Sequence, residues 1–219
     1  MSAKTAAVIG ASGLIGGELL NLLLKDDYFQ TLKILVRSPF NLVHPRLEKK
    51  LVDFNDNDSL LVALENSDVI FCTVGTTQKK VKGDQQAYRK VDYDIPVHAA
   101  RFGKMVGCSV FVLVSAVGAN SKSNNFYLKL KGEVEDEVKK LQIDSVHIMR
   151  PSMLLGARKE FRIGEKIGTP LMKALSFLLP SKYEPIRARD VAKAMVAAAK
   201  KNGKGFLVYE YEDMISVAK

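Results

Sequence analysis

Residues that mark disulfide scaffolds and metal sites are scarce in this sequence of 219 residues. Its two cysteines, Cys72 and Cys108, are far apart and belong to no paired motif, which excludes a disulfide framework and favours two reduced thiols. The three histidines, His44, His98 and His147, are dispersed without the spacing of metal ligands. We therefore expect no metal site.

Long apolar runs are also absent. No stretch of 18 apolar residues occurs, so the sequence predicts no membrane-spanning helix. The first residues, MSAKTAAVIGASG, pass almost directly into an apolar run and leave little room for the apolar region and cleavage site of a secretory signal peptide. We therefore expect a cytoplasmic location.

The net charge of +9 and the pI near 9.4 suit an anionic ligand, a nucleic acid or an acidic membrane surface. The basic residues are nevertheless scattered, and no basic and aromatic signature of RNA binding is present. We expect no nucleic-acid partner and interpret the charge as a basic surface around a phosphate-bearing cofactor.

Short apolar runs alternate with amphipathic segments along most of the chain, as is typical of parallel strands joined by helices. The predicted strands are 5–9, 32–37, 50–54, 68–73, 109–114, 145–149 and 205–209. The predicted helices are 14–25, a short helix capped by Asn57 or Asp58, 85–105, 126–141 and 189–200. The sequence thus predicts an α/β fold with a doubly wound parallel sheet, the Rossmann fold. Because strict alternation ends near Pro151, we expect one domain over 1–219 with a small substrate-side lobe at 151–187.

A glycine-rich turn, Gly10-Ala-Ser-Gly13-Leu-Ile-Gly16, joins the first predicted strand to the first predicted helix. Gly10 permits the sharp turn, Gly13 lets the main chain approach a pyrophosphate, and Gly16 lets the helix pack closely on the strand. Free N–H groups at the helix start then bind phosphate. This context predicts a dinucleotide site, the alternative being a turn without a ligand. The predicted phosphate-binding residues are Gly10, Ser12, Gly13, Leu14, Ile15 and Gly16.

The second predicted strand ends at Arg37-Ser38, and the segment 34–40 contains no acidic residue. NAD sites usually place an acidic residue here to bind the ribose 2′-hydroxyl, whereas an arginine suits the 2′-phosphate of NADP. We therefore predict NADP(H), with Arg37 as an ordinary surface charge as the alternative. Asp53 and Phe54 end the third predicted strand and are placed to contact adenine, although Asp53 is equally suited to cap a helix.

Tyr127 and Lys131 are four residues apart in a predicted helix, so their side chains lie on one face, one turn apart. A neighbouring ammonium favours the phenolate form of a tyrosine, which brings the phenol within the range of acid–base chemistry. Ser115 ends the fifth predicted strand and is suited to bind a substrate carbonyl. Together the three predict a hydride-transfer site. The alternative is a partly buried tyrosine beside a solvated lysine.

These residues resemble those of the short-chain dehydrogenase/reductase superfamily, in its atypical short branch, and in particular the Tat-interacting-protein-like oxidoreductases. Further segments that carry the resemblance are Val52-Asp53-Phe54, Cys72-Thr-Val-Gly-Thr-Thr77, Val91-Asp92-Tyr93, Asn125-Phe-Tyr-Leu-Lys-Leu-Lys-Gly-Glu-Val134 and Arg150-Pro151-Ser152. The resemblance implies NADPH binding and a catalytic triad of Ser115, Tyr127 and Lys131. It also implies cofactor contacts from Thr73, Val74, Gly75, Thr76, Pro151 and Ser152. Ala116-Val117 departs from the family's pattern on the substrate side.

The leading hypothesis is an NADP(H)-dependent reductase or dehydrogenase that acts on a carbonyl or alcohol substrate. The second is an NADPH-binding regulator or redox sensor that docks a protein partner, and a homodimer is also compatible with the sequence. The third is a nucleotide-sugar epimerase or dehydratase with bound NAD, against which Arg37 argues.

Three further features invite a functional interpretation. His147 interrupts a strand in the manner of a core histidine. Cys72 is near the expected cofactor and is suited to redox sensing, but a buried inert thiol is favoured. The apolar stretch 171–179 is compatible with four roles: it is buried in the lobe, lines the substrate pocket, contacts a partner subunit or contacts a membrane.

Overall fold

A single parallel sheet organises the chain. The computed structural model describes residues 4–155, 180–201 and 203–219. Within these residues, seven parallel strands are ordered β3–β2–β1–β4–β5–β6–β9. The strands are β1 (Lys4–Ile9), β2 (Phe29–Val36), β3 (Leu47–Leu51), β4 (Val69–Cys72), β5 (Val110–Val114), β6 (Ser145–Met149) and β9 (Gly205–Tyr209). The strand order reverses between β1 and β4, and ligands of such sheets bind at the carboxyl ends of the strands at this point.

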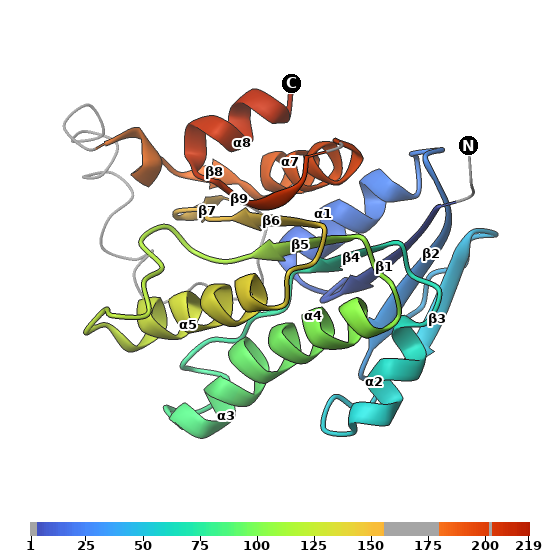
Figure 1. Cartoon of the computed structure of the whole chain (residues 1–219), viewed down its shortest axis with the longest axis horizontal. Helices are drawn as coiled ribbons and strands as arrows, with labels where there is room; N and C mark the ends of the chain where they lie inside the picture. Colours follow the sequence, from blue (N-terminus) through green and yellow to red (C-terminus); the bar gives the residue numbers. More distant parts are fainter. Residues whose placement is uncertain (1–3, 156–179, 202) are drawn as a thin grey trace.

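Helices cover both faces of the sheet (Figure 1). One face carries α1 (Leu14–Leu23), α7 (Ala188–Lys200) and α8 (Tyr211–Val217), and the other carries α2 (Asn57–Leu64), α4 (Ile95–Met105) and α5 (Phe126–Lys140). Two hydrophobic clusters fill the spaces between the sheet and the two helix layers. The predicted doubly wound α/β fold is therefore confirmed.

The central strands are apolar on both sides because both faces of the sheet are covered. All four residues of β4 are buried, as are Ala6 to Ile9 in β1. The edge strand β3 is only partly buried, and its sequence LEKKL carries a weaker signal. It ends at Leu51 rather than at the predicted residue 54, so Asp53 and Phe54 lie in the loop that follows it.

The predicted helix 85–105 is interrupted. It consists of α3 (Gln85–Arg89), a π-helical turn (Lys90–Asp94) and α4. Pro96, in the first turn of α4, has no N–H to donate to the preceding turn, and a local widening of the helix accommodates this loss. Asp92 lies in the widened turn and is buried.

Other helix boundaries also differ from the sequence predictions. The N-cap of α2 is Asp56, whose side chain accepts a hydrogen bond from the Asp58 N–H, and not Asn57 or Asp58 themselves. The helix α8 was not predicted; it follows β9 directly and begins with a capping box between Glu210 and Asp213.

Part of the expected lobe at 151–187 lies outside the described residues, including the apolar stretch 171–179. Its described ends meet, because β7 (Leu154–Leu155) pairs in parallel with β8 (Ile186–Arg187) after a short 3₁₀ turn at Ser181–Tyr183. None of the helices among the described residues has the length and apolar character required to cross a bilayer.

Candidate functional site

The glycine-rich turn is built by close contacts between three segments. Gly10 has a φ of +91°, which permits the sharp turn after β1, and its carbonyl accepts from the Gly13 N–H at 2.9 Å. A Cβ at Gly16 would lie 2.1 Å from the Gly10 oxygen and 2.7 Å from Thr73 Oγ1. Thr73 itself donates to the Ile9 carbonyl at 3.0 Å. The ends of β1 and β4 and the start of α1 therefore meet with no room for another atom.

The N-terminus of α1 suits a phosphate. Its N-cap is Gly13, and no side chain among the described residues caps it. Its first turn contains no acidic residue, so nothing there repels an anion. By contrast, α2, α3 and α5 are capped by Asp56, Asp84 and Asn125. The first-turn N–H groups of α1 and the exposed Ser12 thus fit the pyrophosphate of a dinucleotide.

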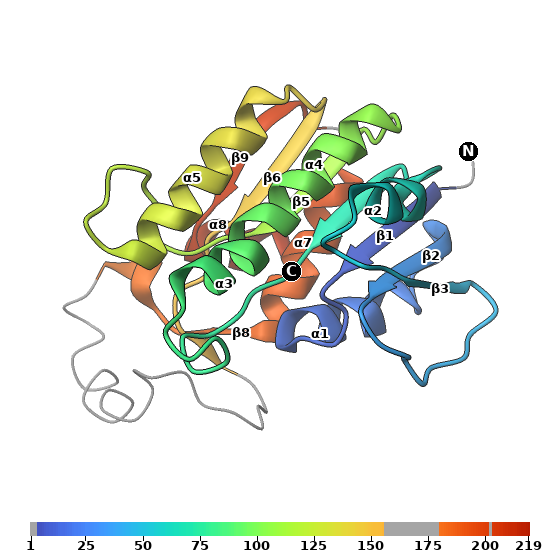
Figure 2. The ribbon, with the colours of Figure 1, turned by 90° about the horizontal axis from the view of Figure 1, so that it is seen from below.

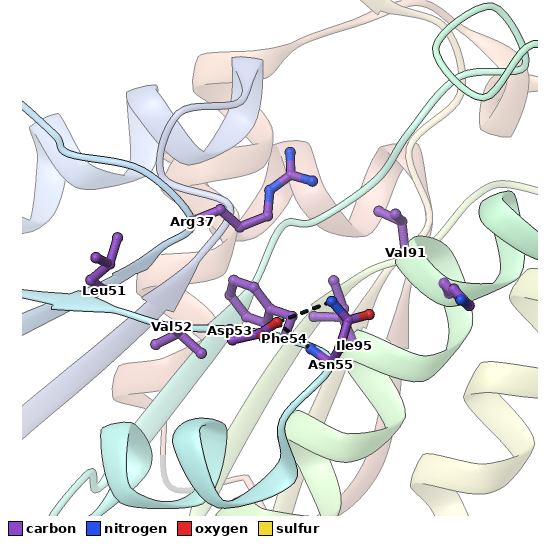
Figure 3. Close-up of a pocket in the computed structure, with 9 residues that line it drawn as sticks. Arg37, Leu51, Val52, Asp53, Phe54, Asn55, Val91 and Ile95 are labelled. Atoms are coloured by element: carbon purple, nitrogen blue, oxygen red, sulfur yellow. Dashed lines mark hydrogen bonds between the residues drawn. The ribbon is translucent and has the colours of Figure 1, made fainter.

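A cavity of about 450 Å³ lies between the segments that follow β2 and β3 and the start of α4. Figure 3 shows Arg37 above it, Phe54 below it and Val91 on the opposite wall, and Lys90 also contributes to the lining. The Asp53 carboxylate, also at the cavity, accepts from the Asn55 N–H at 2.9 Å and from its side-chain amide at 3.0 Å. Asp53 therefore orders its own loop and does not cap a helix. The cavity thus combines apolar side chains with polar and charged ones, as suits the adenosine end of a dinucleotide.

Lys131 forms a buried ion pair that the sequence analysis missed. Its Nζ is 3.0 Å from Oδ1 of Asp92, and the two side chains are 6% and 2% exposed. The other oxygen of Asp92 accepts from the Thr76 N–H at 2.6 Å. Burial opposes the charge on Lys131, but Asp92 and Tyr127 more than offset this effect, so the pKa of Lys131 lies above its ordinary value. Asp92 therefore links α5, through Lys131, to the segment that follows β4, through Thr76.

Tyr127 lies one turn before Lys131 in the first turn of α5 and is partly buried. The Lys131 Nζ is 5.9 Å from the centre of the Tyr127 ring. The ring of Tyr88 packs edge-on against Tyr127 with centroids 6.5 Å apart, and the Tyr88 hydroxyl donates to the Thr76 carbonyl at 3.3 Å. Thr76 is thus held at both its N–H and its carbonyl, next to the predicted catalytic residues.

Ser115 follows β5 directly, is buried and belongs to a second buried network. Its hydroxyl donates to Oε1 of Glu135 at 2.5 Å. Glu135 also pairs with Arg150, which follows β6 and donates from Nε at 3.1 Å and from Nη2 at 2.5 Å. Sequence reasoning missed Glu135 as well. Its position four residues after Lys131 on the same helix face was the available signal.

The remaining predicted contacts lie at the same edge of the sheet. Pro151 is buried, and its carbonyl accepts from the Val117 N–H at 3.0 Å. The Ser152 hydroxyl donates to the Glu184 carbonyl. Val74 and Gly75 continue the chain from β4 towards Thr76, and Gly75 is exposed.

The side chains interpreted as core residues are buried. His147 hydrogen bonds with the Ser145 hydroxyl at 2.8 Å and with the Tyr209 hydroxyl at 3.0 Å, and burial lowers its pKa to about 4. Burial raises the pKa of the Cys72 and Cys108 thiols to about 12. Such thiols are unreactive at neutral pH.

A family model described as NAD(P)H-binding matches residues 10–202. The chain belongs to this NAD(P)H-binding family. Among curated relatives, it is 32% identical to Protein HTATIP2 of Rattus norvegicus over 94% of this chain and 85% of the relative. It is also 32% identical to Protein FMP52, mitochondrial, of Candida albicans over 91% of this chain and 90% of the relative. The resemblance to the Tat-interacting-protein-like proteins is thereby confirmed.

Solved structures show the same fold. MoeE5 in complex with UDP-glucuronic acid and NAD superimposes with a TM-score of 0.72 at 16% identity, over 98% of this chain and 81% of that chain. The UDP-glucose 4-epimerase of Thermotoga maritima, with UDP-glucose, gives 0.71 at 12% identity over the same shares of the two chains. At these identities the likeness establishes the Rossmann-type fold and no particular substrate.

The expected cytoplasmic location is wrong. The FMP52 relatives from Candida albicans, Candida glabrata and Debaryomyces hansenii are each named mitochondrial. The expectation rested on the lack of a secretory signal and of a membrane span, and neither feature distinguishes the cytoplasm from an organelle with its own import route.

Proposed function

We propose that this protein is an NADP(H)-dependent oxidoreductase of the short-chain dehydrogenase type, which transfers hydride to or from a carbonyl or alcohol substrate. One observation carries the proposal. Lys131, on the same helix as Tyr127, pairs with Asp92, and Asp92 accepts from the Thr76 N–H. Thr76 follows β4 at the edge of the sheet where α1 begins without a side-chain cap. The acid–base residues and the phosphate-binding turn therefore share one edge of the sheet.

The cofactor would lie across the carboxyl ends of β1, β2 and β4. Main-chain N–H groups of Leu14 and Ile15 would bind the pyrophosphate, Arg37 and Ser38 the 2′-phosphate, and Phe54 the adenine. Segment 73–76, with Pro151 and Ser152, would line the nicotinamide side. The organisation as one domain with a substrate-side lobe at 151–187 belongs to the same proposal.

The bound NADPH supplies the hydride. Tyr127 donates the proton to the substrate oxygen in reduction and accepts it in oxidation. Lys131 has three N–H donors, of which Asp92 accepts one, so donors remain for a ribose hydroxyl and for stabilising the Tyr127 oxygen. The side chains that surround Lys131 thus hold it in place beside the tyrosine.

The test is NADPH oxidation, followed by absorbance, with a panel of aldehydes, ketones and quinones. Tyr127→Phe should lower kcat/KM by at least about a hundredfold, because it removes the proton donor. Tyr28→Phe, which deletes the same atom from an exposed tyrosine, is the matched control. Turnover that is unaffected by Tyr127→Phe would show that the acid is assigned wrongly.

Binding of NADPH without turnover of any compound in the panel would favour the regulatory alternative. In that case NADPH should change the capture of a protein partner in a pull-down. A thermal-shift comparison of NADPH and NADH at equal concentration tests the choice of dinucleotide, since stabilisation follows affinity.

We further propose a mitochondrial location, on the basis of the names of the FMP52 relatives. The full chain with a C-terminal tag should co-purify with a mitochondrial marker in cell fractionation. A tag recovered entirely with a cytosolic marker would refute this.

A further inference from the structure

Ser115 is expected to donate a hydrogen bond to the substrate carbonyl, but its proton is already directed elsewhere. Its Oγ donates to Glu135 Oε1 at 2.5 Å, and both residues are buried, at 4% exposed each. A serine hydroxyl has one proton and a carboxylate has none to return. The oxygen of Ser115 therefore has only lone pairs left for the substrate side.

Arg150 ensures that Glu135 can only accept the Ser115 hydrogen bond and not donate one. Its guanidinium binds both oxygens of Glu135, and a guanidinium can only donate. Its positive charge compensates the buried carboxylate, which would otherwise be costly to hold there. The backbone adds rigidity, because the Arg150 N–H donates to the Tyr209 carbonyl at 2.9 Å and the Ser115 N–H donates to the Met149 carbonyl at 2.7 Å.

We propose that Glu135, held by Arg150, is a positioning residue that makes Ser115 a hydrogen-bond acceptor at the substrate site. The proposal rests on the proposed function and deepens it. Tyr127 is then the donor to a substrate carbonyl, and Ser115 accepts from the hydroxyl of an alcohol substrate or product. In reduction, the carbonyl carbon gains the hydride of NADPH and its oxygen gains the Tyr127 proton, while the Ser115 proton stays with Glu135.

Magnitudes separate this role from that of an oxyanion donor. Loss of one neutral hydrogen bond costs about three- to tenfold, whereas loss of a donor to a developing oxyanion costs about 10²- to 10³-fold. Ser115→Ala should therefore lower kcat/KM for carbonyl reduction by no more than about tenfold. A loss of a hundredfold or more in the otherwise unchanged protein would overturn the proposal.

Glu135→Met/Arg150→Met provides the decisive background. The double variant removes the acceptor of the serine proton together with the cation that compensates it, so the serine proton becomes free for the substrate. Ser115→Ala should then cost about a hundredfold in this background. An equal cost in both backgrounds would show that Glu135 is merely structural. Thermal unfolding and NADPH affinity serve as folding controls. If this double variant does not fold, Glu135→Leu/Arg150→Leu removes the same buried pair and should give the same result.

A second measurement requires no turnover and separates this proposal from the proposed function. Ser115→Cys introduces a thiol whose ionisation is followed by its ultraviolet absorbance. Next to a carboxylate it should ionise at a higher pH than in Ser115→Cys/Glu135→Gln, by about one unit or more. Both variants also carry Cys72→Ala and Cys108→Ala, because these buried native thiols ionise in the same alkaline range. The same midpoint in both variants would overturn the proposal even if the enzyme is active. An inactive wild-type protein with shifted midpoints would refute only the proposed function.

Discussion

Asp92→Asn tests the buried ion pair that fixes Lys131. The substitution keeps an oxygen that can accept from the Thr76 N–H but removes the charge that lies 3.0 Å from Lys131 Nζ. Breaking a buried pair by neutralising one partner leaves the other charge uncompensated and costs about 3–5 kcal/mol. We expect the lower end, about 3 kcal/mol, because the hydrogen bond to Thr76 survives. For a chain of this size, this corresponds to a fall in Tm of roughly 6–12 °C.

The cost should depend on pH in a defined direction. In the wild type, Asp92 raises the pKa of Lys131, so its stabilisation is complete below the unfolded value near 10.5 and is lost only as the pH rises through the folded value. In Asp92→Asn, burial still lowers the pKa of Lys131 but the carboxylate that raised it is gone, so the pKa in the folded state falls below that in the unfolded state. The variant therefore gains stability as the pH rises. The difference between the two proteins should be greatest near pH 7 and should narrow towards pH 10.5.

Urea unfolding at a series of pH values measures both effects. The matched control is Asp68→Asn, since Asp68 pairs with Lys4 at 2.9 Å but both side chains are about one-third exposed. An exposed pair contributes less than about 1 kcal/mol. Equal costs for the two substitutions, or a cost of Asp92→Asn that does not change with pH, would refute this account of the pair.

Three other predictions concern the cofactor site and the core. Arg37→Gln should weaken NADPH binding about 10- to 100-fold in a fluorescence titration and leave NADH binding unchanged, because it removes a charge-assisted contact to the 2′-phosphate; equal weakening of both would contradict that role. Gly16→Val should lower the free energy of unfolding by more than about 3 kcal/mol and abolish NADPH binding, since its Cβ alone would lie 2.1 Å from the Gly10 oxygen; Gly17→Val, where the nearest atom is 3.7 Å away, is the control. Burial lowers the pKa of His147 to about 4 in the folded state, so on acidification the unfolded chain takes up this proton before the folded protein does. The free energy of unfolding should therefore fall by roughly 3 kcal/mol as the pH drops from 6.5 to 4. In His147→Gln this part of the acid limb, measured by urea unfolding, should disappear, and an unchanged limb would assign it to other groups.

The fold was predictable because local pattern and tertiary environment agree in the central strands. Buried strands such as β4 are continuous apolar runs between turn residues, and their position in the sheet makes them so. The edge strand β3 has one face without cover, and its polar sequence shifted the predicted range by three residues. The π-helical turn before α4 depends on the cooperation of Pro96 with tertiary contacts of Asp92, which periodicity alone does not encode.

For the candidate site, the sequence predicted Ser115, Tyr127 and Lys131 but not the buried side chains that pair with Ser115 and Lys131. The spacing of Tyr127 and Lys131 is local, so it is visible along one helix. The pairing of Lys131 with Asp92 spans 39 positions and connects two helices, and the pairing of Ser115 with Arg150 through Glu135 joins the ends of two strands. Such contacts are set by the packing of α5 on the sheet. Figure 2 shows that α5 lies alongside α4 there. A sequence without its fold cannot specify them.

The interlocked turn at Gly10, Gly16 and Thr73 determines how this protein can meet its cofactor. The close packing around Gly10 and Gly16 leaves this loop few alternative conformations to lose when a ligand binds, so most of its ordering cost is met when the chain folds. We therefore expect the dinucleotide to adapt to the loop, and we expect discrimination between dinucleotides to depend on the cavity that Arg37 lines, beyond β2.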